Sequence, residues 1–306
     1  MLLSGGFRCL RASVRRSWRD SVFDIQTIAI ISQAVRELRP LVHCITNHVT
    51  VNDCANVLLA AGASPCMAEE VETAVETASI SAGVNLNIGT LHHGTLDAMV
   101  AAARRANEIG IPVTLDPVGV GASQFRNRAV ALLLKEASFA AIRGNMSELK
   151  ALATGSGTTK GVDVAASDAI NENNYKELGS LLRGLAEKLG TIVVASGPID
   201  LATDGRTLYG IHNGSPMMGT ITGSGCMLTT FLCGWLAANN KLEKPFSVLD
   251  ATVAAVCAYD VCGQLAAEKT KEKHGGIGTF RTELLDAVSL VLPETLCGLS
   301  NVETIE

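Results

Sequence analysis

From Asp24 onward, the chain alternates between segments with helical periodicity and short apolar segments typical of strands. Helices are predicted at 26–38, 51–61, 69–81, 95–109 and 146–154, and strands at 41–46, 64–67, 85–88, 113–116, 139–142 and 191–196. The run Thr191-Ile-Val-Val-Ala is continuous and β-branched, as expected of a strand covered on both faces. This alternation predicts βαβ units, and therefore an α/β protein with a mainly parallel central sheet.

After Ser196 the pattern changes to two short strand segments, 199–203 and 207–211, with Asp204-Gly205 between them. An Asp-Gly pair in this position predicts a tight hairpin, which would add antiparallel strands to one edge of the sheet. Beyond Cys226 the chain is predicted to be helical almost to its end, most clearly at 246–269 and 278–292. No internal repeat or change in composition marks a linker, so we expect residues 25–306 to form a single domain.

Residues 1–24 are set apart from this pattern. The first nineteen contain five arginines and three serines but no acidic residue. That is the composition of an organellar transit peptide, although a mis-assigned start would look the same. The nine cysteines show no metal-ligand clustering and are interpreted as reduced thiols. We therefore expect a disordered or targeting-like extension on a cytoplasmic protein, or on a mitochondrial one if the targeting is genuine.

Charge and hydropathy exclude two classes of partner. The formal net charge is -5, the pI is near 5.7, and no basic stripe occurs in the body of the chain. Nucleic-acid-binding proteins usually carry a basic face, so we expect no nucleic-acid partner. No stretch approaches the roughly 18 uninterrupted apolar residues of a membrane helix, so we expect no membrane partner either.

A glycine-rich turn stands out at Gly223-Ser224-Gly225, directly before an apolar segment, 226–239, that is predicted to be helical. Unpartnered amides at a helix N-terminus and the helix dipole favour the binding of an anion, so phosphate is the expected ligand. The same dipole is expected to lower the pKa of the Cys226 thiol, although not enough by itself to make it reactive. The alternative is a glycine-rich turn before a buried helix, without a binding role.

Polar residues follow four of the predicted strands, where open parallel sheets bind ligands. They are Asn47, Asp116, the segment Arg143-Gly-Asn-Met-Ser-Glu148, and Ser196. Phosphoryl transfer needs oxygen ligands for Mg²⁺, a cation facing the phosphates and an anion hole. Asp116 and Glu148 would supply the oxygen ligands, Arg143 would supply the cation, and the glycine turn would supply the anion hole.

Each of these residues also has a structural interpretation. Asp116 precedes a proline and would then only cap a turn. Asn145 and Glu148 have the spacing of a capping box for the helix 146–154, a role that does not exclude function. Arg143 would be a solvated charge at a strand end. The six histidines lack ligand spacing in the sequence, and His92-His93 is interpreted as an exposed turn rather than a metal pair.

Five ordered motifs together resemble the hydroxyethylthiazole kinases of thiamine salvage, a family in the ribokinase-like superfamily. They are Cys44-Ile-Thr-Asn-His-Val-Thr-Val-Asn-Asp-Cys-Ala-Asn56, Ala63-Ser-Pro-Cys-Met-Ala68, Leu115-Asp-Pro-Val-Gly119, Arg143-Gly-Asn-Met-Ser-Glu148 and Thr222-Gly-Ser-Gly-Cys-Met-Leu228. The resemblance extends from about Gln26 to Leu292. It implies a three-layer αβα sandwich of the ribokinase-like kind, and a homotrimer with its active sites between subunits.

The resemblance also implies ATP- and Mg²⁺-dependent phosphorylation of the hydroxyl of 4-methyl-5-(2-hydroxyethyl)thiazole. By similarity, the residue roles are ATP binding for Arg143 and Ser196, thiazole binding for Asn47, Val49, Met67 and Gly223, metal binding for Asp116 and Glu148, and catalysis for Cys226 with Gly223, Ser224 and Gly225. Family members more often have Thr where this chain has Ser224 and Ser196, but both substitutions keep a hydroxyl.

Rival functions remain open on the same fold. They are a related kinase for a hydroxymethylpyrimidine or a sugar, and a dehydratase that repairs hydrated nicotinamide cofactors. Both usually carry Asp where this chain has Cys226, a position at which Asp serves as base in much of the superfamily. A non-enzymatic thiazole-binding regulator would be expected to have lost the carboxylates or the glycine turn, and this chain keeps both.

Overall fold

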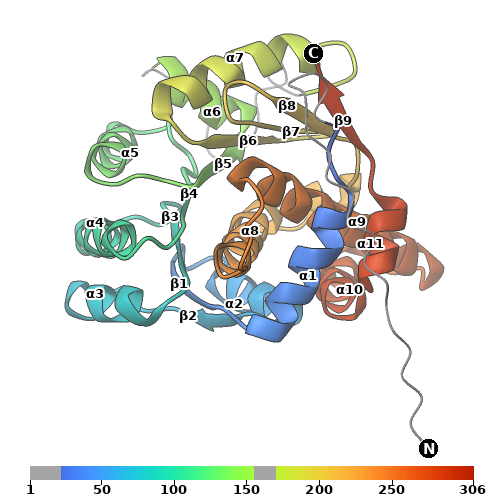
Figure 1. Ribbon diagram of the computed structural model, residues 1–306, viewed down its shortest axis with the longest axis horizontal. Helices are drawn as coiled ribbons and strands as arrows, with labels where there is room; N and C mark the ends of the chain where they lie inside the picture. The colour runs from blue at the N-terminus through green and yellow to red at the C-terminus, as the bar shows by residue number, and fades with distance from the viewer. Residues whose placement is uncertain (1–21, 155–169) are drawn as a thin grey trace, which may run out of the picture.

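The computed structural model describes residues 22–154 and 170–306, which fold around one mixed sheet (Figure 1). Within this part, nine strands lie in the order β2-β1-β3-β4-β5-β6-β7-β8-β9. Their bounds are β1 Leu41–Ile45, β2 Ser64–Cys66, β3 Gly83–Asn87, β4 Val113–Asp116, β5 Ala141–Asn145, β6 Ile192–Ser196, β7 Asp200–Thr203, β8 Leu208–Ile211 and β9 Val302–Ile305. Every pair from β2 through β6 is parallel, and the remaining pairs are antiparallel. This confirms the predicted α/β class.

Helices cover both faces of the sheet and make it the middle of three layers (Figure 1). One face carries α3 Val71–Ile80, α4 His93–Glu108, α5 Gln124–Glu136, α6 Met146–Thr154 and α7 Tyr175–Leu189. The other carries α1 Gln26–Leu38, α2 Val51–Ala61, α8 Ser224–Asn240, α9 Val248–Glu272, α10 Ile277–Leu290 and α11 Pro293–Leu299. Two apolar cores lie between these layers, one on each face of the sheet. The three-layer αβα sandwich is therefore confirmed.

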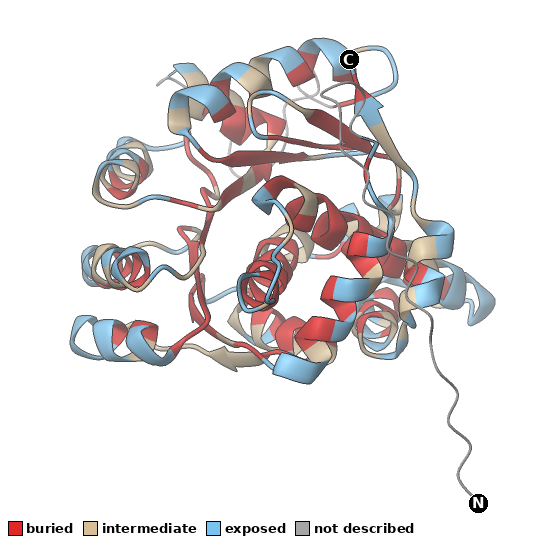
Figure 2. Ribbon diagram, viewed as in Figure 1, coloured by how far each residue is buried: buried red, intermediate tan, exposed pale blue. Residues whose placement is uncertain are grey.

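Helix α8 is buried on all sides, as its coloring in Figure 2 shows. Every residue from Met227 to Asn239 is buried, and the helix contacts β3, β4, α2 and α9. A helix that is apolar all round is typical of a protein core or a membrane span, and the structure places α8 in the core. Its position fixes the N-terminal turn of α8 beside the carboxyl ends of the parallel strands.

Helix α9 is long and apolar enough to cross a membrane by length and composition alone. However, 78% of its apolar window is buried inside the protein, where the helix packs against α8 and α10. That is the environment of a core helix. The eight cysteines in the described ranges are all free thiols, as the sequence predicted.

The structure differs from the sequence predictions mainly at the C-terminal end. The predicted hairpin forms as β7 and β8, but it is not the edge of the sheet because β9 pairs with β8 beyond it. The predicted helix 278–292 forms as α10, which ends two residues earlier at Leu290, and a separate short helix, α11, follows from Pro293. Helix α9 begins only at Val248, because the Ser247 hydroxyl accepts from the amide of Asp250 and caps it.

The folded part extends slightly into the segment predicted as an extension. Phe23 is buried and its ring packs edge-on against Tyr209, with ring centroids 5.8 Å apart. Residues 1–21 lie outside the described residues, so the targeting-like extension and the predicted cytoplasmic or mitochondrial location stay predictions.

Candidate active site

The glycine turn forms the uncapped start of α8. Gly223 is the N-cap residue with φ +83°, a left-handed conformation that favours glycine, and the Thr50 methyl group fills the space that a Cβ would need. The first helical hydrogen bond runs from Met227 N to Gly223 O at 2.8 Å. No side chain caps this helix, and its first turn contains no acidic residue. The turn is therefore able to bind an anion through its backbone amides.

Arg143 lies directly over this turn. It ends in a guanidinium that contacts Gly225 so closely that any Cβ there would collide with it. Nη2 of Arg143 donates a short hydrogen bond to the hydroxyl of Ser196, and Nη1 lies 3.9 Å from Asp116 Oδ2. Burial alone would lower the pKa of Arg143, but Asp116 and Glu148 raise it above its usual range. The site thus holds a permanent cation beside the anion-binding turn.

Asp116 ends β4 and is fully buried. Its Oδ2 accepts from Asn87 Nδ2 at 2.9 Å and from the Thr229 hydroxyl at 3.2 Å. Its Oδ1 is buried without a hydrogen-bond partner among the described residues. Burial raises the pKa of Asp116, while the nearby Arg143 charge opposes that shift. An unpaired buried oxygen of this kind is a free ligand atom for a cation.

Glu148 is held by backbone amides on both carboxylate oxygens. Oε1 accepts from Gly119 N and Oε2 from Asn145 N, each at 2.8 Å. In return Asn145 Oδ1 accepts from Glu148 N at 2.9 Å, which is the reciprocal capping box that the sequence suggested. Burial and the nearby Asp116 charge raise the pKa of Glu148 to about 7. Glu148 caps α6 and also lies near Asp116, so its capping role does not exclude a role in metal binding.

Cys226 points toward Asn47 and the Asp116 network. Asn47 Nδ2 donates to Cys226 Sγ at 3.4 Å and to Asn87 Oδ1 at 3.0 Å. Burial and the Asp116 charge raise the pKa of Cys226 to about 12. The expected lowering by the helix dipole is therefore wrong, because desolvation and a neighbouring carboxylate outweigh the dipole. At neutral pH the side chain is a protonated thiol.

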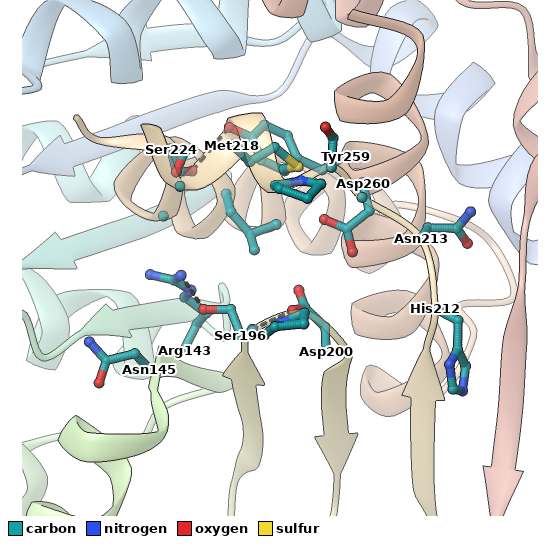
Figure 3. Close-up of a pocket in the computed structure, with 18 residues that line it drawn as sticks. Arg143, Asn145, Ser196, Asp200, His212, Asn213, Met218, Ser224, Tyr259 and Asp260 are labelled. Atoms are coloured by element: carbon teal, nitrogen blue, oxygen red, sulfur yellow. Dashed lines mark hydrogen bonds between the residues drawn. The ribbon is translucent and has the colours of Figure 1, made fainter. Parts of the chain in front are cut away.

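A cavity of about 500 Å³ opens beside these groups (Figure 3). Arg143, Ser196 and the start of α8 line one end of it. Asp200 on β7 and Asp260 on α9 face each other across the space, close enough for their carboxyl groups to interact. A volume of this order suits a nucleotide-sized ligand.

The predicted thiazole contacts lie outside that cavity. Asn47 is buried at the end of β1, Met67 is half-buried directly after β2, and the side chain of Val49 is 65% exposed. Thr50 joins this region to the glycine turn, since it packs on Gly223 and donates twice to Asn47 Oδ1 at 3.1 Å. The turn therefore lies between the cavity on one side and the loops that carry Asn47, Val49 and Met67 on the other. We call this second side the open region, because Val49 is exposed there.

Several site residues were missed by sequence reasoning. Asn87 and Thr229 hold Asp116, and Asp200 and Asp260 line the cavity. Asn87 carried a usable signal, because it is a polar residue near the end of the predicted strand 85–88. Asp260 carried another, since it is an acidic residue within a long apolar helical segment.

The chain matches the family model "Hydroxyethylthiazole kinase family" over residues 32–294. It is 43% identical over 287 residues to a hydroxyethylthiazole kinase of Methanobrevibacter smithii, which covers 92% of this chain and 98% of that protein. A solved hydroxyethylthiazole kinase structure from Pyrococcus horikoshii OT3 superposes with a TM-score of 0.78 at 32% identity, covering 92% of this chain and 100% of that one. A ribokinase-like superfamily protein from Enterococcus faecalis V583 shares the fold alone, with a TM-score of 0.55, 13% identity, and coverage of 91% of this chain and 92% of that one. This protein belongs to the hydroxyethylthiazole kinase family, with a ribokinase-like fold.

Proposed function

We propose that this protein transfers the γ-phosphate of ATP to the hydroxyl of 4-methyl-5-(2-hydroxyethyl)thiazole, as a kinase of thiamine salvage. One observation carries the proposal: the cation of Arg143 lies over the uncapped N-terminus of α8, next to a buried carboxylate with a free oxygen. Phosphoryl transfer depends mainly on positioning and charge stabilisation, and this arrangement supplies both.

The nucleotide binds in the 500 Å³ cavity. Its phosphates lie against the amides at the start of α8, where Arg143 and Ser196 contact them. The guanidinium is held in place by Ser196 and by the approach to Gly225, so little side-chain entropy is lost when a phosphate binds. The nucleoside then extends toward Asp200 and Asp260, at the far side of the cavity.

The donors present fit a magnesium ion. Asp116 offers a buried oxygen without a partner, and Glu148 offers carboxylate oxygens that each accept only one amide. Mg²⁺ held there would offset phosphate charge during transfer. Asn87 and Thr229 keep Asp116 oriented through its other oxygen, which would leave Oδ1 free to bind the cation.

Cys226 positions the acceptor alcohol rather than removing its proton. A thiol with a pKa of about 12 keeps its own proton at neutral pH, so it accepts none from the substrate. In a loose transition state the attacking hydroxyl loses its proton late, and a strong base is not required. Asn47, fixed by Thr50, holds the sulfur in place through its amide.

The thiazole ring binds between the glycine turn and the open region formed by Asn47, Val49 and Met67. Exposure of the Val49 side chain supports a site completed by a second subunit in a homotrimer. Helix α3 also exposes apolar side chains, with Val71 and Val75 each 40% exposed and Ile80 75% exposed. Val71 and Val75 lie one helical turn apart on the same face, which is suited to subunit contact.

A coupled ADP-release assay against a panel of thiazole, pyrimidine and sugar alcohols tests the function. We expect turnover with the hydroxyethylthiazole at a kcat/KM at least about 10²-fold above the other alcohols, because only the correct ring fills its pocket. Preference for a pyrimidine or sugar alcohol would identify a related kinase instead. Binding of the thiazole without any ADP release would identify a regulator, and water loss from a hydrated nicotinamide cofactor would identify the dehydratase.

A further inference from the structure

Three loops meet at the carboxyl ends of β1, β2 and β3 and bring together side chains far apart in the sequence. His48 follows β1, Glu69 follows β2 and His92 follows β3. One ligand atom from each side chain lies within 4.8 Å of the other two. The histidines were predicted to lack ligand spacing, which holds along the sequence, but parallel strands place two of them at one edge of the sheet.

Hydrogen bonds hold each loop in place before any ligand binds. The His48 amide donates to Thr90 Oγ1 at 3.0 Å, which ties the loop after β1 to the loop after β3. His43 Nε2 lies 2.7 Å from Ala68 O, and it fixes the backbone directly before Glu69. The His92 ring is held by Thr95, whose hydroxyl lies 2.6 Å from Nε2. The cluster therefore rests on anchored loops rather than on chance contacts of free side chains.

The donor set is that of a borderline-soft metal. We propose that His48, Glu69 and His92 form a three-ligand site for a first-row divalent transition cation, with Zn²⁺ as the favoured ion. Two imidazole nitrogens and one carboxylate leave an open coordination position, as in many His₂Glu zinc sites. Ligand atoms about 2.1 Å from one metal lie at most about 4.2 Å apart, so small rotations of these partly exposed side chains close the site.

The local charge favours a cation here. No lysine or arginine occurs between Arg39 and Arg104, whereas Glu69, Glu70 and Glu72 follow one another closely in this loop and helix. Arg126 from α5 does approach the loop after β3, where its Nη2 donates to Gly89 O at 2.6 Å. At His92, Nδ1 accepts from the Thr95 amide at 3.3 Å as the N-cap of α4, and Thr95 Oγ1 also lies 3.3 Å from it. A metal on either ring nitrogen would replace its contact with Thr95, and the other nitrogen would keep Thr95 as the partner that orients the ring.

An occupied site would join the three loops into one unit. Asn47, Val49 and Met67 lie on two of these loops, so the metal would stiffen the open region beside the glycine turn. Binding of Zn²⁺ is therefore expected to raise the melting temperature of the protein. Neither binding nor this stabilisation requires the proposed kinase activity, so both can be measured without substrate.

The test uses the untagged full chain after chelator dialysis, with ZnCl₂ followed by titration calorimetry and CoCl₂ followed by visible absorption. We expect one equivalent of Zn²⁺ and a Co²⁺ spectrum without sulfur charge-transfer bands. His48→Ala, Glu69→Gln and His92→Asn should each weaken binding at least about tenfold, since each removes a ligand. Asn at position 92 keeps a side chain able to cap α4.

His93→Ala is the matched control. His93 is the next residue and equally exposed, but its ring packs against Phe125 with centroids 4.8 Å apart, away from the cluster. Its removal should leave Zn²⁺ affinity unchanged. The site is refuted if the wild-type chain binds no equivalent of Zn²⁺, if the three ligand variants bind as tightly as the wild type, or if Co²⁺ shows thiolate bands that place the metal on cysteine.

Discussion

The side-chain amide of Asn47 donates to the sulfur of Cys226 across 3.4 Å, and so joins the end of β1 to the first turn of α8. Asn47 also reaches Asn87, whose amide in turn donates to Asp116. A polar chain thus runs from the proposed alcohol site to the proposed metal site. Cys226 is one member of this chain. With a pKa of about 12, its side chain is a protonated thiol and not a thiolate at neutral pH.

Removal of the Arg143 charge should weaken nucleotide binding selectively. Each charge-assisted hydrogen bond contributes about 1.5–3 kcal/mol, so Arg143→Ala should raise the Kd for ATP by about 10- to 150-fold per bond lost. Thiazole binding should change little, because Arg143 lies on the cavity side of the turn. Titration calorimetry with each ligand measures both values. Equal losses for the two ligands would indicate damage to the fold instead.

Glu148→Gln tests the metal role against the capping role. The variant keeps the size of the side chain but lacks its charge, so we expect turnover to fall by about 10² or more. Each carboxylate oxygen of Glu148 accepts a hydrogen bond from a backbone amide, and the substitution replaces one of these oxygens with an NH₂ donor. A small loss of thermal stability should therefore accompany the change. Turnover measured at limiting Mg²⁺ distinguishes the two roles. An unchanged rate would show that Glu148 only caps α6 and does not bind the metal.

Asp260 should make the stability of the unliganded protein depend on pH. Burial and the neighbouring Asp200 raise the pKa of Asp260 well above its usual range. A raised pKa means that the folded state binds the proton more tightly than the unfolded state does. The contribution of Asp260 to the free energy of unfolding is therefore fully present below its unfolded pKa of about 4. This contribution is lost as pH rises toward the folded pKa.

Asp260→Asn removes this titration while keeping the shape of the side chain. Its melting temperature should fall less between about pH 5 and about pH 8 than that of the wild type. Asp97→Asn, on the exposed face of α4, is the control and should follow the wild-type curve. Parallel curves for the wild type and the Asp260 variant would show that this carboxyl group stays ionised in the fold.

The proposed trimer places Val49 at a subunit contact. A charge at this exposed apolar position should weaken association, so Val49→Asp should reduce the fraction of trimer in sedimentation equilibrium and raise the KM for thiazole. Leu290→Asp, at another exposed apolar side chain on α10, controls for the added charge. A wild-type monomer with full activity would contradict a site shared between subunits.

Local sequence signals were sufficient for the layers of the fold and for the residues at strand ends. The alternation of segments gave α1, α2 and α6 with their observed bounds. Asp116, Arg143 and Ser196 were found because they lie at or directly after the ends of predicted strands, although Arg143 lies inside β5 in the structure. Strand β9 was missed, because its two apolar residues, Val302 and Ile305, lie on opposite faces of a four-residue strand and give no alternating pattern.

Properties that depend on distant neighbours could not be predicted. The direction of the Cys226 pKa shift follows from burial and from Asp116, which is more than one hundred residues away along the chain. The convergence of His48 with His92 likewise depends on the order of strands in the sheet rather than on spacing. Helix dipoles and sequence motifs act locally, whereas desolvation is set by the completed fold.

The central claim is that Cys226 positions the alcohol and does not act as its base, and the pH dependence of kcat for Cys226→Ala tests this most directly. Steady-state rates of the variant and the wild type are compared from about pH 6 to about pH 9 at saturating ATP and Mg²⁺. Positioning predicts measurable activity, reduced by about 10- to 10²-fold, with a pH profile parallel to that of the wild type. Loss of activity as complete as in a variant lacking the glycine turn would show that the thiol is an obligatory base, and would contradict this account.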